Sequence, residues 1–137
     1  MIRDLIAFLE TDATLYSLLN ANAGNSKMFA MIGDKPRGET SPYILYSSTT
    51  GTTAPVLEES IIQLSIIAEK YDDAQDISYR LDELLDVWEG LNKKVPSTNF
   101  YIYYGRKIGG NDSYEQDTKL YNSVRLFSIK YKRKNGG

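Results

Sequence analysis

The sequence predicts an α+β fold in which one long helix packs on a mostly antiparallel sheet of about five strands, with short N-terminal helices. The chain has 137 residues, of which 42% are apolar and 25% charged, and this suffices for one domain with its own core. The spacing of apolar residues is helical at the start, alternates in the middle and becomes helical again at residue 72. A single domain is therefore predicted over residues 1–137, with a flexible end at 130–137.

Two short amphipathic helices are expected at the N-terminus. Apolar residues recur with helical spacing, with a break near Thr11–Asp12: Ile2, Leu5, Ile6 and Leu9, then Leu15, Leu18 and Leu19. The polar stretch 20–26 is typical of a loop. Residues 27–33 predict a short strand that ends at Gly33.

Two further strands are expected on either side of a polar connection. Pro42 opens a stretch rich in aromatic and β-branched residues, which favours a strand. Residues 58–69 alternate clearly, with one apolar face formed by Ile62, Leu64, Ile66 and Ala68. The connection predicts a flexible hairpin that could dock on a partner, with its candidate contacts at Thr49, Thr50, Gly51, Thr52 and Thr53.

From Asp72 onward the apolar residues follow a helical stripe. Its members are Ala74, Ile77, Leu81, Leu84, Leu85 and Trp88. Gly90 is expected to end this helix and Pro96 to prevent its continuation. Two final strands are expected at 99–110 and 119–132, joined by the polar stretch GGNDSYEQDT.

Composition excludes several kinds of active site. The chain has no cysteine and no histidine, so disulfides, zinc–thiolate sites, thiol nucleophiles and serine–histidine triads are impossible. Neither GxxxxGK[ST] nor GxGxxG occurs, and no apolar run is long enough to span a bilayer. We therefore expect a protein without enzymatic activity, without a cofactor or metal, and without a membrane partner.

The acidic stretch around residues 69–76 raises the alternative of a metal-dependent hydrolase. A calcium loop needs a glycine at its sixth position, and no glycine lies between Gly51 and Gly90. Asp72 and Asp73 instead stand where the helix begins, so one of them is expected to cap it while both face the positive end of its dipole. The hydrolase alternative would depend on the same two aspartates.

Opposite charges in different parts of the chain predict contact surfaces within one subunit or between neighbours. Residues 72–89 are strongly acidic, whereas residues 119–137 contain no acid and six basic residues: Lys119, Arg125, Lys130, Lys132, Arg133 and Lys134. The candidate interface residues are Tyr101, Tyr103, Arg106, Lys107, Asp82, Asp86, Arg125, Lys130, Lys132 and Arg133. A nucleic-acid-binding module that uses the tyrosine-rich strand and the basic C-terminus is an alternative for the same residues.

Three motifs carry a resemblance to a known family. A helix of the type YDDAxxIxxxLxxLL is matched by Tyr71, Asp72, Asp73, Ala74, Ile77, Leu81, Leu84 and Leu85. Ser41 to Ile44 match an xPYI strand opening, and residues 117–129 match a final strand. With this order of elements, the chain resembles the tail terminator, or tail completion, proteins of long-tailed bacteriophages and prophages.

The resemblance implies a non-enzymatic virion protein of siphophage type. Such a protein forms a homohexameric ring that caps the tail tube and joins it to the head connector, or neck protein. DNA passes through the lumen without sequence-specific binding. The expected location is the tail–head junction of the virion, and the host cytoplasm during assembly. Head-completion and connector proteins share related folds, so head–tail joining by such a protein is an alternative.

Overall fold

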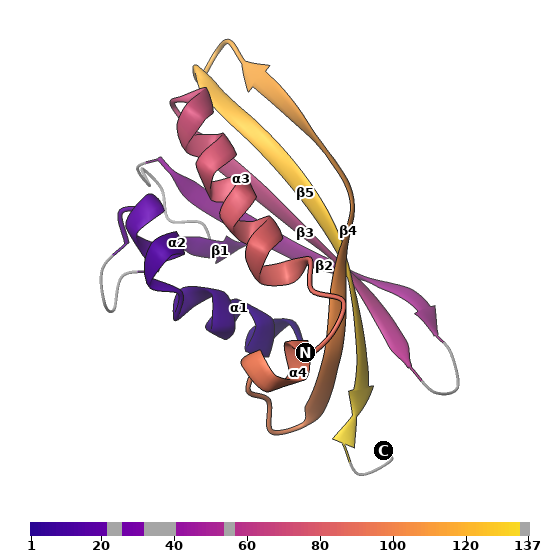
Figure 1. Ribbon diagram of the computed structural model, residues 1–137. Coiled ribbons are helices and arrows are strands. Elements are labelled where there is room, and N and C mark those ends of the chain that lie inside the picture. The colour runs from indigo at the N-terminus through magenta and orange to yellow at the C-terminus, as the bar shows by residue number, and fades with distance from the viewer. Residues whose placement is uncertain (22–25, 32–40, 54–56, 135–137) are drawn as a thin grey trace.

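The computed structural model of the protein describes residues 1–21, 26–31, 41–53 and 57–134 (Figure 1). Its elements are α1 (Ile2–Glu10), α2 (Ala13–Leu18), β1 (Met28–Ala30), β2 (Tyr43–Thr53), β3 (Glu58–Ala68), α3 (Tyr71–Leu85), α4 (Leu91–Lys94), β4 (Phe100–Glu115) and β5 (Leu120–Arg133). Among these helices, none is both long enough and apolar enough to cross a membrane.

The strands form a five-stranded sheet in the order β1-β2-β3-β5-β4. β1 runs parallel to β2, and the other neighbours pair antiparallel. The helices α1, α2 and α3 lie on one face of this sheet (Figure 1). The α+β class, the mostly antiparallel sheet and the covering long helix are therefore confirmed.

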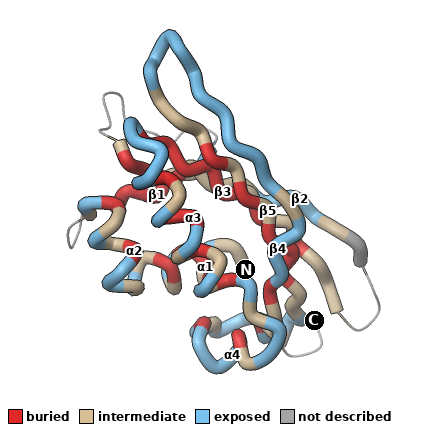
Figure 2. The backbone as a smooth tube through the Cα atoms, turned by 45° about the horizontal axis from the view of Figure 1, so that its top comes forward, coloured by how far each residue is buried: buried red, intermediate tan, exposed pale blue. Residues whose placement is uncertain are grey.

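The core lies between α1–α3 and the sheet. The predicted apolar face of β3 is fully buried at Ile62, Leu64, Ile66 and Ala68. These residues belong to one cluster with the α1, α3 and β5 side chains Leu5, Leu9, Ile77, Leu81 and Phe127. Figure 2 shows this burial at the centre of the sheet, whereas the hairpin that joins β4 to β5 extends into solvent.

The predicted break between the two N-terminal helices is confirmed, and Asp12 accounts for it. Asp12 is the N-cap of α2, and its Oδ2 accepts a hydrogen bond from the backbone N–H of Leu15 at 2.8 Å. The same carboxylate accepts two hydrogen bonds from Arg80 of α3, at 2.9 Å from Nε and 2.6 Å from Nη2. One side chain thus starts α2 and fastens it to α3.

Replacing Asp12 with alanine is expected to lower the free energy of unfolding by about 2 kcal/mol, because it removes a helix cap and a charge-assisted pair together. The hydrogen bond from Arg80 is the largest cause that lowers the pKa of Asp12. The stabilisation is therefore present above the unfolded carboxyl pKa of about 3.9 and is lost as the pH falls through the lower folded pKa. Urea unfolding at pH 7 and at pH 3 measures both effects. Asp12→Asn is the control, since it keeps a cap acceptor without the charge; equal stability of all three proteins at pH 7 would contradict the prediction.

The prediction for the end of the long helix is wrong. α3 ends at Leu85, because the chain leaves the helix at Asp86 and Val87 then exchanges two backbone hydrogen bonds with Gly105 of β4, at 3.0 and 3.1 Å. Trp88 consequently lies outside the apolar stripe and is 63% exposed. Gly90 has a left-handed φ of 78° and begins the short helix α4 before Pro96.

Two expected connections and part of the expected flexible end form strand. β4 continues through the polar residues to Glu115, and only residues 116–119 form the turn to β5. Thr49, Thr50 and Thr53 pair with β3, so this part of the expected docking hairpin extends the sheet; residues 54–56 lie outside the described chain. Residues 130–133 pair with β4, whereas 135–137, like Gly33, lie outside the described residues.

Candidate assembly surface

Antiparallel pairing brings two of the predicted groups together. Tyr101 of β4 lies opposite Lys132 of β5, and Phe100 lies opposite Arg133. Tyr101 is 46% exposed, and the Lys134 Nζ lies 4.9 Å from the centre of its ring. Basic residues of α4 and of the end of β5 lie at this end of the molecule, and we call them the basic pole: Lys93, Lys94, Lys132, Arg133 and the half-buried Lys134.

Ser97 holds the basic pole against the first helix. Its hydroxyl donates to the Asp4 carboxylate of α1 at 2.9 Å and accepts the backbone N–H of Phe100 at 3.1 Å. Its carbonyl oxygen accepts a hydrogen bond from the Lys134 Nζ at 2.7 Å. The start of α1, the start of β4 and the end of β5 are therefore fixed relative to one another.

The middle of β4 is tied to α3 by charges inside the subunit. The Lys107 Nζ forms an ion pair with Asp82 at 3.0 Å, and the backbone N–H of Lys107 donates to the Asp86 carboxylate at 3.2 Å. Of the two arrangements that the charge pattern allowed, these residues form the intramolecular one. Lys130 is likewise paired within the chain, with Glu59 at 3.4 Å.

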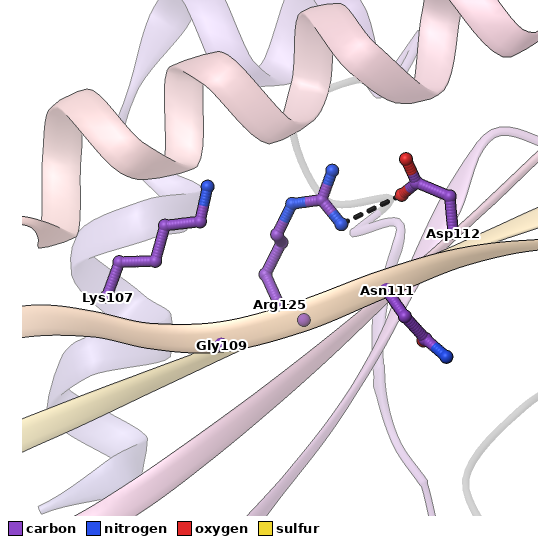
Figure 3. Close-up of a pocket in the computed structure, with 6 residues that line it drawn as sticks. Lys107, Gly109, Asn111, Asp112 and Arg125 are labelled. Carbon is purple, nitrogen blue, oxygen red and sulfur yellow. Dashed lines mark hydrogen bonds and ion pairs between the residues drawn. The ribbon is translucent and has the colours of Figure 1, made fainter.

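Arg125 is also used inside the subunit and is only 8% exposed. Its Nε donates to the Ser78 hydroxyl at 2.6 Å, and its Nη1 donates to Asp112 at 2.8 Å. Burial tends to raise the pKa of Asp112, but the hydrogen bonds from Arg125 and Gln75 and the positive charge of Arg125 outweigh it and lower that pKa. In Figure 3, Arg125, Asp112 and Lys107 all point toward α3, whereas Asn111 points away. The cavity that they line is thus a charged joint between the helix and the β4–β5 hairpin.

Two further aromatic contacts involve residues of β4. The Arg106 guanidinium lies 5.7 Å from the centre of the Trp88 ring, a pair that sequence reasoning missed because Trp88 fitted the helical stripe. The only available signal was its nearness to Gly90 in the sequence. Tyr103 lies where β4 shifts register, and its ring centre is 6.2 Å from that of Tyr101.

The acidic residues at the start of α3 do not cap it as predicted. The helix begins one residue earlier, at Tyr71, so Lys70 is the N-cap and forms no side-chain cap hydrogen bond. Asp72 and Asp73 lie in the first turn and are exposed, where they still face the positive end of the helix dipole. Across the described ranges, no group of three or more acidic side chains is arranged to hold a metal ion.

The tip of the β4–β5 hairpin lies beside the start of α3. The Tyr121 ring centre is 5.6 Å from that of Tyr71 and 4.7 Å from that of Tyr114. The exposed acids of this end, which we call the acidic pole, are Glu69, Asp72, Asp73, Asp76, Glu115 and Asp117. Tyr71 and Tyr114 are 46% and 47% exposed among them.

Comparison with known proteins yields a structural likeness. No family model matches the chain, and neither does any curated protein sequence. Among solved structures, a chain from the virion of a native gene transfer agent particle aligns with a TM-score of 0.65 at 11% sequence identity. The alignment covers 92% of this chain and 90% of the other. At this identity, the likeness establishes a shared fold over nearly the full length of both chains.

Proposed function

We propose that the protein is a structural component of a phage-like virion that caps the tail tube as a homohexameric ring and joins it to the head connector. The observation that carries this proposal is the shared fold, along nearly all of both chains, with a chain of a gene transfer agent virion. The family resemblance of the sequence supports the tail-terminating role within that class. The protein then acts at the tail–head junction, after assembly in the host cytoplasm.

The described surface suits assembly better than catalysis. Large aromatic side chains are exposed at several places, namely Tyr71, Tyr79, Trp88, Tyr101 and Tyr114. Rigid rings of this kind are enriched at protein interfaces, where they add contact area with little loss of conformational entropy. The ionisable groups that approach one another inside the subunit, such as Arg125 with Asp112, are paired by opposite charge and hold elements together.

Electron microscopy and mass photometry of the purified protein test the ring. We expect rings of six subunits, formed either in solution or on added tail tubes, and tubes that carry a ring should stop elongating at that end. A chain that stays monomeric at every concentration and does not bind tail tubes would rule the proposal out. A ring that binds a head connector but leaves tube elongation unchanged would favour the related head-completion role.

A second candidate, nucleic-acid binding, is favoured by one observation. Tyr101 is exposed opposite Lys132, with the Lys134 Nζ 4.9 Å from its ring centre, and an aromatic ring next to cations suits both the bases and the phosphates of DNA. Binding of short DNA that weakens steeply with salt would support this function for the isolated chain. Within the ring, the same contact would serve DNA in the lumen without sequence preference.

A further inference from the structure

We infer that the acidic pole of one copy of this chain binds the basic pole of the next copy, so that subunits join head to tail. The inference rests on the proposed ring and specifies which surfaces form it. It follows from where the unpaired exposed charges of the described residues lie, from the aromatic side chains among those charges, and from the geometry that a closed ring of subunits requires.

The two poles lie at opposite ends of the molecule. Figure 1 shows the start of α3 and the β4–β5 turn at the upper end, and α4 with the N-terminus at the lower end. α3 separates them, and its 15 residues span roughly 22 Å at 1.5 Å per residue. This exceeds the screening length of about 8 Å at physiological salt, so the two poles do not neutralise each other within one subunit.

The charges that the fold leaves exposed complement each other in sign. The acidic pole contains Asp72, Asp73 and Asp76 on the outer side of α3, all of them exposed. The basic pole contains the exposed Lys93, Lys132 and Arg133. By contrast, several charges between the poles already have partners within the subunit, as Asp82 has in Lys107 and Asp12 in Arg80. Lys70 and Lys119 are exposed beside the six acids of the acidic pole, and Glu89 is exposed just before α4, so each pole keeps an excess of one sign that a second copy meets with the opposite sign.

Each pole also carries an exposed aromatic ring for the centre of an interface. Tyr71 and Tyr114 stand among the acids, and Tyr101 stands among the bases. A contact made by charges alone would add little stability in water, because exposed ion pairs are weak. Aromatic anchors inside a charged rim are the usual composition of a stable interface. The pairing of two different surfaces is heterologous, and such a contact forms a ring when its rotation closes.

Charge reversal tests the inference. In the acid-reversed variant, Asp72, Asp73 and Asp76 become lysine; in the base-reversed variant, Lys93, Lys132 and Arg133 become glutamate. Each variant alone should remain monomeric, because both of its poles then carry the same sign. An equimolar mixture of the two should form rings in which they alternate, and a chain with both reversals should form rings by itself.

The readout is mass photometry, with and without tail tubes, over a range of salt concentrations. Circular dichroism identifies any variant that fails to fold, and the mixture and the double reversal test the contact independently of single-variant stability. A control chain with Ala7→Lys, Thr14→Lys and Ser17→Lys adds positive charge at exposed positions away from both poles and should still form rings. Ring formation by wild type and the control should decline as salt rises.

The outcomes separate this inference from the proposed function. If wild type forms rings and both single reversals do so equally well, the poles are not the contact although the ring is real. If the base-reversed variant forms rings but loses affinity for short DNA, the basic pole faces nucleic acid and the inference is wrong. If wild type forms no ring in solution or on tail tubes, the proposed function fails together with this inference.

Discussion

Replacing Gly105 with alanine is expected to lower the free energy of unfolding by about 3 kcal/mol, at the upper end of the usual cost of overpacking. Gly105 is buried beneath the end of α3, and an added Cβ would lie closer to the Leu85 carbonyl oxygen than the 3.0 Å that real Cβ atoms keep. The same Cβ would meet the Ile129 side chain at 2.9 Å. Since the first obstacle is backbone, either α3 shifts or the hydrogen bonds between Gly105 and Val87 break.

Chemical unfolding in urea measures this effect, and Gly109→Ala is the matched control on the same strand. A Cβ at Gly109 would have the Leu126 Cδ1 as its nearest neighbour, at an ordinary 3.7 Å. The control should change stability by no more than about 0.5 kcal/mol. Equal effects at the two glycines would show that close packing between α3 and β4 does not matter to the fold.

Replacing Phe127 with alanine is expected to cost about 3–5 kcal/mol, the range for a large side chain removed from a well-packed core. Phe127 is fully buried on β5 and pairs with Ile62 of β3 on one side and with Lys107 of β4 on the other. Its side chain therefore lies on the helix-covered face at the centre of the sheet. Little can move in to fill the cavity, because its neighbours belong to paired strands.

The preceding residue is the control for this substitution. Leu126 is only half-buried and points to the opposite face of the sheet, so Leu126→Ala should cost about 1 kcal/mol. Thermal unfolding of the two variants in parallel measures the difference. A larger loss at Leu126 than at Phe127 would mean that the face without helices is the better-packed one.

Local periodicity was sufficient to predict most of the elements. The alternation in β3 and the repeated helical spacing with a break at Asp12 each depend on neighbours a few residues apart, and both appear in the structure. The helical stripe was correct up to Leu85 for the same reason. It failed at Trp88 because the helix ends where Val87 pairs with Gly105, a contact between segments that no short window of sequence contains.

The surface was less predictable than the fold, because pairing across the sheet decides which charges remain free. Arg125 and Arg133 lie on the same strand and looked equivalent in the sequence. Arg125 is enclosed by Ser78 and Asp112, whereas Arg133 lies at the end of β5 and is exposed. The tyrosine and basic groups were both identified, but their proximity follows only from the β4–β5 register.

The junction at Ser97 has a practical consequence for experiments on this protein. Because Asp4 and Lys134 contact the same serine, an affinity tag or fluorescent protein fused to either end would emerge close to the basic pole. The charge of Arg133 even contributes to lowering the pKa of the Met1 amino group, after burial as the main cause. A terminal fusion could therefore block subunit contacts and imitate a monomer, whereas a label inserted at the exposed turn of residues 116–119 would report from the opposite end of each subunit.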